Sequence, residues 1–285
     1  MLVLAFLLMQ VMISAKAGLV NYTDGQSNVR LHEQVPAGTP VQTGPHSHVE
    51  LLLNPGSFLR LDENSSAVLD SVELTNIAVR LVDGAALIET ADVSKETPIR
   101  VTTANLSVLI TSRGLYRFSG GTVSVLDGKI RIPDSSMTIK KGHQVTLIAG
   151  SYVDSAATNP PDGLDQWSRQ RSSDLARANA MAYHEHSAGT VYSLSGYPGW
   201  GIPPAGSAWL YSPRLSGFTF IPLRNYRSFY GYGFFPLSSF GLYGLSGARP
   251  AGGSIRGSAN GRSSGSHPSY GGRMGGRIGG GHGRR

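Results

Sequence analysis

Short runs of alternating apolar and polar residues fill the chain from Gly18 to about Gly150. Gly, Pro, Asn and Asp separate these runs, and such alternation is typical of strands that bury one face. No helical period stands out in this region. Many short strands at this spacing predict an all-β domain, an antiparallel sandwich or roll of the jelly-roll type. The predicted strands are Val29–Val35, Pro40–Thr43, Val49–Leu53, Phe58–Leu61, Ala67–Leu69, Ile77–Val82, Ala85–Glu89, Ile99–Thr103, Leu106–Ile110, Leu115–Phe118, Val123–Leu126, Lys129–Ile132 and Gln144–Ile148.

The residues around Asp127-Gly128 give the clearest local prediction. Val123 and Val125 precede this dipeptide and Ile130 and Ile132 follow it, with a polar residue between the members of each pair. Asp-Gly tolerates the positive φ angles of a tight two-residue turn. The pattern therefore predicts a hairpin in which Val125 lies opposite Ile130 and Val123 opposite Ile132, so that all four side chains share one apolar face. A single hairpin is marginal in water, so we expect this unit to pack against another sheet.

The chain opens with an apolar run, MLVLAFLLMQVMISA, that leads into Ala15-Lys16-Ala17. A short apolar stretch followed by A-x-A is typical of a secretory signal peptide, so residues 1–17 are predicted to be cleaved off after Ala17. The alternatives are an uncleaved anchor or a core strand, although a spanning helix needs about 20 residues. No other segment is apolar enough to span a membrane. Cysteine is absent, so an exported form would depend on core packing without disulfides.

Composition changes after Gly150. Residues 151–163 are predicted to form a linker, and residues 164–186 have the only helical composition in the chain, as a surface-docking helix anchored by Trp167. Residues 187–246 are rich in aromatics, Gly and Pro, which predicts a region of low order. Residues 247–285 are Gly, Ser and Arg with almost no apolar residue, so the tail is predicted to be disordered.

Two features of this C-terminal part bear on binding. Residues 208–222 are compatible with a small hairpin in which Trp209 and Tyr211 face Phe218 and Phe220. The tail carries seven of the 25 basic residues and no acidic one, which leaves 25 − 7 = 18 basic against 18 acidic residues elsewhere. The net charge of +7 is therefore a property of the tail, and such a tail suits a polyanion or serves only for solubility.

No residue pattern typical of catalysis is present. The sequence has no nucleophile motif, phosphate loop or dinucleotide fingerprint, and its carboxylates are scattered, so we predict neither enzyme activity nor a cofactor. His46-Ser47-His48 and His184-Glu185-His186 are pairs of potential metal ligands, but neither has an evident third ligand. We expect solvated histidines and predict no metal site.

The β region opens with the stretch GTPVQTGPHSHVELLLNPGSFLRLDENS. This stretch resembles the FecR domain family, in which a "G-x-x-V-x-T-G" step is followed by an apolar strand, a Gly turn and an "L-R-L" strand. The resemblance covers about 130 residues in the expected order. It continues through VRLVDGAALIE, PIRVTTANLSVLITSRGLYRF, VSVLDGKIRI and IKKGHQVTL. The phrase D-Q-W-x-x-x-R at residues 165–171 is similar to the start of a C-terminal region that often follows FecR domains in envelope proteins.

The resemblance implies a bacterial extracytoplasmic β domain, periplasmic or at the cell envelope. In iron-dicitrate regulators, such a domain sits outside the membrane and signals inward to an anti-sigma segment. The first hypothesis is an exported, non-enzymatic FecR-domain protein that binds or scaffolds an envelope protein or an anionic cell-surface polymer, with no specific nucleic acid. The alternatives are an extracytoplasmic sensor in FecR-type signalling and a glycan-binding protein. The residues predicted to contact a partner are Trp200, Trp209, Tyr211, Arg256, Arg262, Arg273, Arg277, Arg284 and Arg285.

Overall fold

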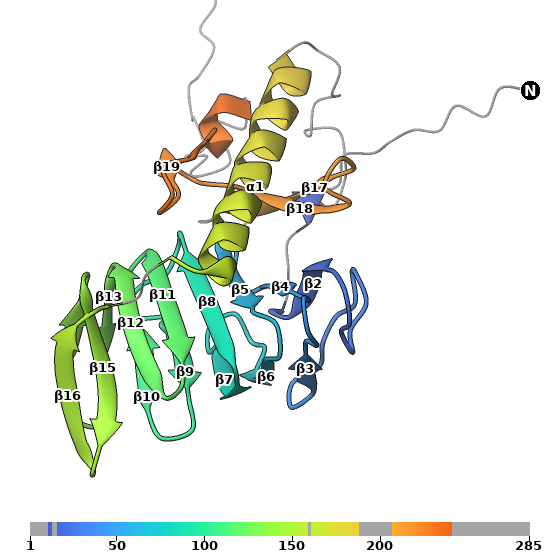
Figure 1. Cartoon of the computed structure of the whole chain (residues 1–285). Coiled ribbons are helices and arrows are strands. Elements are labelled where there is room, and N and C mark those ends of the chain that lie inside the picture. Colours follow the sequence, from blue (N-terminus) through green and yellow to red (C-terminus); the bar gives the residue numbers. More distant parts are fainter. Residues whose placement is uncertain (1–10, 13–15, 159–160, 188–206, 241–285) are drawn as a thin grey trace, which may run out of the picture. The chain divides into compact units, whose positions relative to one another are not determined.

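Two β-sheets face each other and enclose the main hydrophobic core (Figure 1). The computed structural model describes residues 11–12, 16–158, 161–187 and 207–240. Within these residues, every strand pair is antiparallel except β7–β9, which is parallel. The fold is therefore the predicted all-β sandwich, with helix α1 added outside it.

The first sheet has eight strands in the described residues. In spatial order they are β16 (Ser151–Ala156), β15 (His143–Ile148), β12 (Thr122–Asp127), β11 (Gly114–Ser119), β8 (Ala85–Thr90), β5 (Ser57–Leu61), β4 (Val49–Leu52) and β2 (Leu19–Thr23). The second sheet has seven, namely β14 (Thr138–Lys140), β13 (Lys129–Arg131), β10 (Ser107–Ile110), β9 (Ile99–Thr102), β7 (Ala78–Asp83), β6 (Ser66–Ser71) and β3 (Pro40–Gln42).

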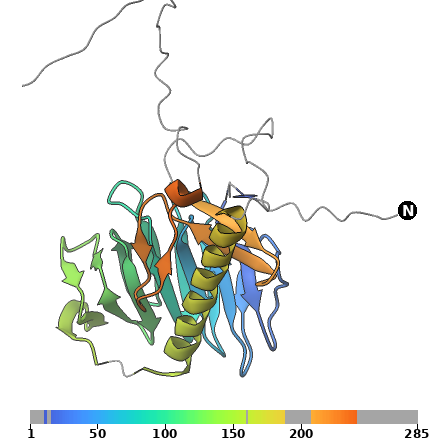
Figure 2. The ribbon, with the colours of Figure 1, turned by 90° about the horizontal axis from the view of Figure 1, so that it is seen from above.

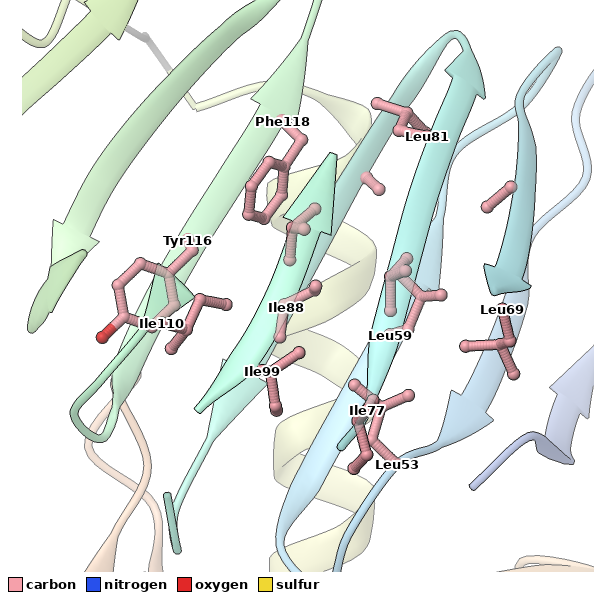
Figure 3. Packing of buried hydrophobic residues seen from close by; sticks show 14 of the residues in the cluster. Leu53, Leu59, Leu69, Ile77, Leu81, Ile88, Ile99, Ile110, Tyr116 and Phe118 are labelled. Carbon is pink, nitrogen blue, oxygen red and sulfur yellow. The ribbon is translucent and has the colours of Figure 1, made fainter. Parts of the chain in front are cut away.

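Alternation along each strand builds the core between the two sheets. On β11, Tyr116 and Phe118 point inward, whereas Leu115 and Arg117 point to the outer face of the eight-stranded sheet. Apolar side chains from both sheets meet in this core and exclude water. Figure 3 labels ten of them: Leu53, Leu59, Ile88, Tyr116 and Phe118 from the eight-stranded side, and Leu69, Ile77, Leu81, Ile99 and Ile110 from the seven-stranded side.

Asp127-Gly128 is a corner between the sheets and not a hairpin turn. Strand β12 pairs with β11 and β15, whereas β13 pairs with β10 and β14, so the predicted pairing of Val125 with Ile130 is wrong. Gly128 has a φ of 88°, and a Cβ there would collide with the hydroxyl of Tyr116. A positive φ at Asp-Gly lets the chain cross from one sheet to the other as readily as it lets the chain form a hairpin. The four apolar side chains still enter one core, but from opposite sheets.

The other strand predictions fall within a residue or two of the observed strands, with one exception. Residues 29–35 form no strand, because the chain turns at His32, whose φ is 63°. Within the sandwich, three observed strands were absent from the prediction, namely β2, β14 and β16. Strand β16 occupies Ser151–Ala156, so it takes up the first half of the predicted linker.

Beyond the sandwich, α1 spans Gly163–Ser187, which agrees with the helix predicted at residues 164–186. It is followed by β17 (Ala208–Ser212), β18 (Gly217–Ile221), β19 (Tyr226–Arg227), β20 (Gly233–Phe234) and the 3-10 helix η2 (Leu237–Phe240). Trp209 pairs with Phe220 and Tyr211 with Phe218, as expected for the hairpin. A short strand, β1 (Val11–Met12), pairs with the free edge of β17.

The prediction of low order for residues 187–246 is wrong for residues 207–240. Their aromatic side chains pack against α1 and the sheet, a long-range contact that no local period reveals. Residues 188–206 and 241–285 lie outside the described residues, as do 1–10 and 13–15, so the predicted signal peptide and disordered tail remain predictions. In the part of the chain that is described, no helix combines the length and apolar character of a membrane span.

Candidate functional site

The outer face of the eight-stranded sheet is divided between a covered half and an open half. Over β2, β4, β5 and β8, apolar residues such as Leu52 and Phe58 are buried beneath α1 and the β17–β18 hairpin. Figure 2 shows α1 lying across this face with the hairpin beside it. Over β11, β12 and β15, outward side chains such as Arg117, Ser124 and Gln144 are polar, whereas Leu115 and Leu126 pack in one cluster with Leu164 of α1. The boundary between the two halves is where the candidate site lies.

Four charged residues are buried between α1 and the sheet, and we call them the charge cluster: Glu50, Arg60, Glu89 and Arg171. None is more than 5% exposed. The Arg60 guanidinium donates to Glu50 Oε2 and to Glu89 Oε2, both at 2.9 Å. Arg171, from α1, donates to Glu50 Oε1 at 2.8 Å. The two cations and two anions balance, which is the arrangement that makes burial of charge tolerable.

Helix α1 contributes to this cluster because its polar residues share one face. Ser168, Arg171 and Ser172 are spaced by three and four residues and therefore point the same way. Arg60 Nη1 donates to the Ser168 hydroxyl at 2.7 Å, and the Ser172 hydroxyl donates to Glu89 Oε2 at 2.7 Å. These bonds hold the helix over the sheet at one position, since a shift along its axis would leave buried charges unpaired.

Glu50 stays ionised in this setting. Burial works to raise the pKa of Glu50, but the neighbouring guanidiniums of Arg171 and Arg60 outweigh it and lower the pKa to about 2. Asn21 adds a further hydrogen bond to Glu50 at 2.8 Å and also donates to the Phe218 carbonyl at 2.9 Å. The cluster thus connects the sheet, the helix and the C-terminal hairpin.

A second ionic contact fixes the start of α1. Arg117 of β11 binds the carboxylates of Asp162 and Asp165, with its Nη1 3.1 Å from an oxygen of each. Asp162 also accepts a hydrogen bond from the Asp165 backbone, as an N-cap does. Burial raises the pKa of Asp165, whereas for Asp162 the hydrogen bonds from Arg117 overcome burial and lower the pKa.

Beside this contact, the open half of the sheet is hollowed. The hollow measures about 360 Å³ and we call it the polar hollow. Within the described part of the chain, the side chains that line it are polar or charged. Its lining residues are Arg117, Ser119, Thr122, Ser124, Gln144, Thr158 and Asp162.

The structure places Trp209 away from any binding surface. Its side chain is fully buried, 5.3 Å from the Phe58 ring in an edge-on contact, so it has no face free for a sugar. Tyr211 is half-buried against Phe218. Trp200 and the tail arginines (256, 262, 273, 277, 284 and 285) lie outside the described residues.

The predicted histidine pairs do not converge on a common point. The His46 side chain is 96% exposed, whereas His48 stacks on Trp167 with ring centroids 4.5 Å apart. His184 is exposed on α1. Among the described residues, no group of three or more His, Cys, Asp or Glu side chains is placed to hold a metal ion.

Sequence reasoning missed the charge cluster. The available signal was a single charged residue inside each of three predicted apolar strands, at Glu50, Arg60 and Glu89. Such positions are normally apolar, so an isolated charge there indicates a partner outside the sheet. Arg171 gave no such signal, because one arginine on a surface helix is ordinary.

The comparison with protein-family models agrees with the family resemblance. A model of the FecR protein family matches residues 39–131. Two crystal structures from Parabacteroides distasonis, each described as a "putative anti-sigma factor", are 18% and 15% identical to this chain, with TM-scores of 0.35 and 0.36. The alignments cover 41% and 47% of this chain, and 59% and 65% of those chains, less than two thirds of either. No curated protein sequence matches. Residues 39–131, which form most of the sandwich, are therefore a FecR domain.

Proposed function

We propose that this chain is an exported sensor of the FecR type, which works by contact and passes a signal to a membrane-bound partner. The observation that carries the proposal is the FecR domain at residues 39–131. Regulators with such a domain signal from outside the membrane. The apolar run at residues 1–17, with its Ala15-Lys16-Ala17 end, supports export of this chain.

The charge cluster supports a role in transmitting a contact. Buried ion pairs contribute modestly to net stability, but they penalise every arrangement that leaves a charge unpaired. Helix α1 therefore has one strongly preferred position on the sheet, where Arg171 meets Glu50. A partner that displaces α1 would have to replace these bonds, so the helix is suited to a discrete change and not to gradual movement.

The proposal is tested by cross-linking the full chain in intact cells of its native host. A tagged chain should recover an integral membrane protein, and deletion of the gene should change a coherent set of transcripts. The proposal fails if no membrane protein is recovered and no transcript changes.

A binding or scaffolding role at the envelope is the second candidate, and the basic tail favours it. Seven arginines without an acidic residue suit an anionic surface polymer. This role predicts an envelope partner in the same cross-linking experiment but an unchanged transcript profile. Stacking of a sugar on Trp209 is not part of either proposal, because that ring is buried.

A further inference from the structure

The walls of the polar hollow define the chemistry of what it can hold. Register pairs Arg117 with Ser124 and Ser124 with Gln144, which places these three side chains in one row across β11, β12 and β15. Ser119 and Thr122 form the next row. Directly opposed residues project from the same face of a sheet, so both rows line the hollow. The described side chains that line the hollow carry hydroxyl, amide and charged groups, so the hollow suits a hydrophilic ligand.

Charge excludes an anion as the preferred ligand. Among the described residues that line the hollow, the one cation is Arg117, which is already paired with Asp162 and Asp165. Two carboxylates against one guanidinium leave a formal charge of −1 at this point. Phosphate or sulfate would meet net repulsion there, and the arginine has no unpaired positive charge to offer. A neutral ligand is therefore favoured.

The hydrogen-bonding capacity of the lining residues narrows the class of ligand further. Serine and threonine hydroxyls and the Gln144 amide can both donate and accept, whereas the carboxylate of Asp162 accepts only. The Asp162 side chain is 42% exposed, so it can accept from a ligand while it holds Arg117. A ring with adjacent hydroxyl groups matches these donors and acceptors, because each hydroxyl can both donate and accept a hydrogen bond. The volume of about 360 Å³ lies at the lower end of the range for ligand pockets, which is about 300–1,000 Å³.

We infer that the polar hollow binds a neutral saccharide. The inference does not depend on whether the chain signals. The described lining residues include no aromatic ring, so affinity rests on a few exposed hydrogen bonds and the dissociation constant should be on the order of 1 mM. One wall consists of Thr158 and of Asp162, which caps α1. A bound sugar would therefore touch the start of the helix.

The test is a two-dimensional amide NMR titration of the isotope-labelled full chain at millimolar ligand concentrations. The probes are cellotriose, which has plain hydroxyls, and chitotriose, which carries acetamido groups. Inorganic phosphate is the third ligand to be titrated. We expect at least one trisaccharide to shift amides of residues 117–124 and 144–146, and phosphate to leave them unchanged. The response to the two trisaccharides distinguishes a plain glycan from an acetamido glycan.

Gln144→Leu should weaken binding about three- to tenfold, because it removes one amide that can bond the ligand. Gln42→Leu is the matched control, since Gln42 is exposed on β3 of the other sheet, and it should bind as the unaltered chain does. Ser119→Ala is a second variant at an exposed position and should also weaken binding. The inference is overturned if neither trisaccharide shifts these amides, if phosphate shifts them, or if Gln144→Leu and Ser119→Ala bind the sugar unchanged.

Discussion

Replacing Arg60 by methionine would remove the central cation of the charge cluster. Methionine fills the space of the Arg60 side chain with another unbranched side chain. Glu89, however, loses its only arginine partner within the cluster, and the net charge of the cluster changes from zero to −1. Glu50 keeps the bond from Arg171 at 2.8 Å. Removing one partner of a buried ion pair costs about 3–5 kcal/mol, because the remaining charge stays desolvated. That is a large part of the roughly 5–15 kcal/mol by which a typical domain is stable.

The assay is urea unfolding followed by circular dichroism, with the chain and its variants at the same pH and salt concentration. The matched control is Arg80→Met, because Arg80 also pairs with a carboxylate, Asp70, at 2.7 Å but on the surface, where the two side chains are 46% and 41% exposed. Solvent screens such a pair, so this variant should unfold almost as the unaltered chain does. Equal losses for the two variants would refute the view that the buried charges hold the helix on the sheet.

The remaining predictions concern acid stability, the sheet corner, the buried tryptophan and the tail. The pKa of Glu50 is lowered from 4.5 to about 2, so the stability that ionised Glu50 contributes is present above pH 4.5 and is lost as the pH falls towards 2. Glu50→Gln should therefore flatten the pH dependence of the unfolding free energy between these two values. Gly128→Ala should destabilise more than Gly142→Ala in urea unfolding, since both have positive φ but only at Gly128 would a Cβ collide with neighbouring atoms. Trp209→Ala should lower the unfolding free energy by about 3–5 kcal/mol, and a loss below about 1 kcal/mol would show that the ring is not in a packed core. Deleting Arg249–Arg285 should abolish salt-sensitive retention on an anionic matrix without changing thermal unfolding, and unchanged retention would contradict a role for the tail in binding.

Alternation of apolar residues was sufficient to predict most of the strands and the sandwich, because burial of one strand face is a local property of the sequence. Pairing was not local. Asp127-Gly128 permits positive φ in a hairpin and also at a sheet corner, and the two are distinguished by the long-range pairing of β12 with β15 and of β13 with β10. Asp83-Gly84 joins β7 to β8 in the same way, again between the two sheets.

The candidate site was less predictable than the fold. Its residues come from strands and from a helix more than 100 positions away, as in the contact between Arg60 and Ser168. The aromatic segment at 207–240 lacks a period, so composition suggested low order, whereas Phe220 is fully buried against Trp209. Aromatic residues become ordered when a partner surface exists, and here that surface is the sheet face of the same chain.

The central claim is that α1 and the C-terminal hairpin fold as one unit with the FecR sandwich through the charge cluster. Native-state hydrogen exchange measures this most directly, because it reports the opening free energy of each segment separately. The account predicts that amides of α1 around residues 168–176 and of β18 are protected as strongly as those of β5 and β8. Rapid exchange of α1 and β18 beside a protected sandwich would contradict it.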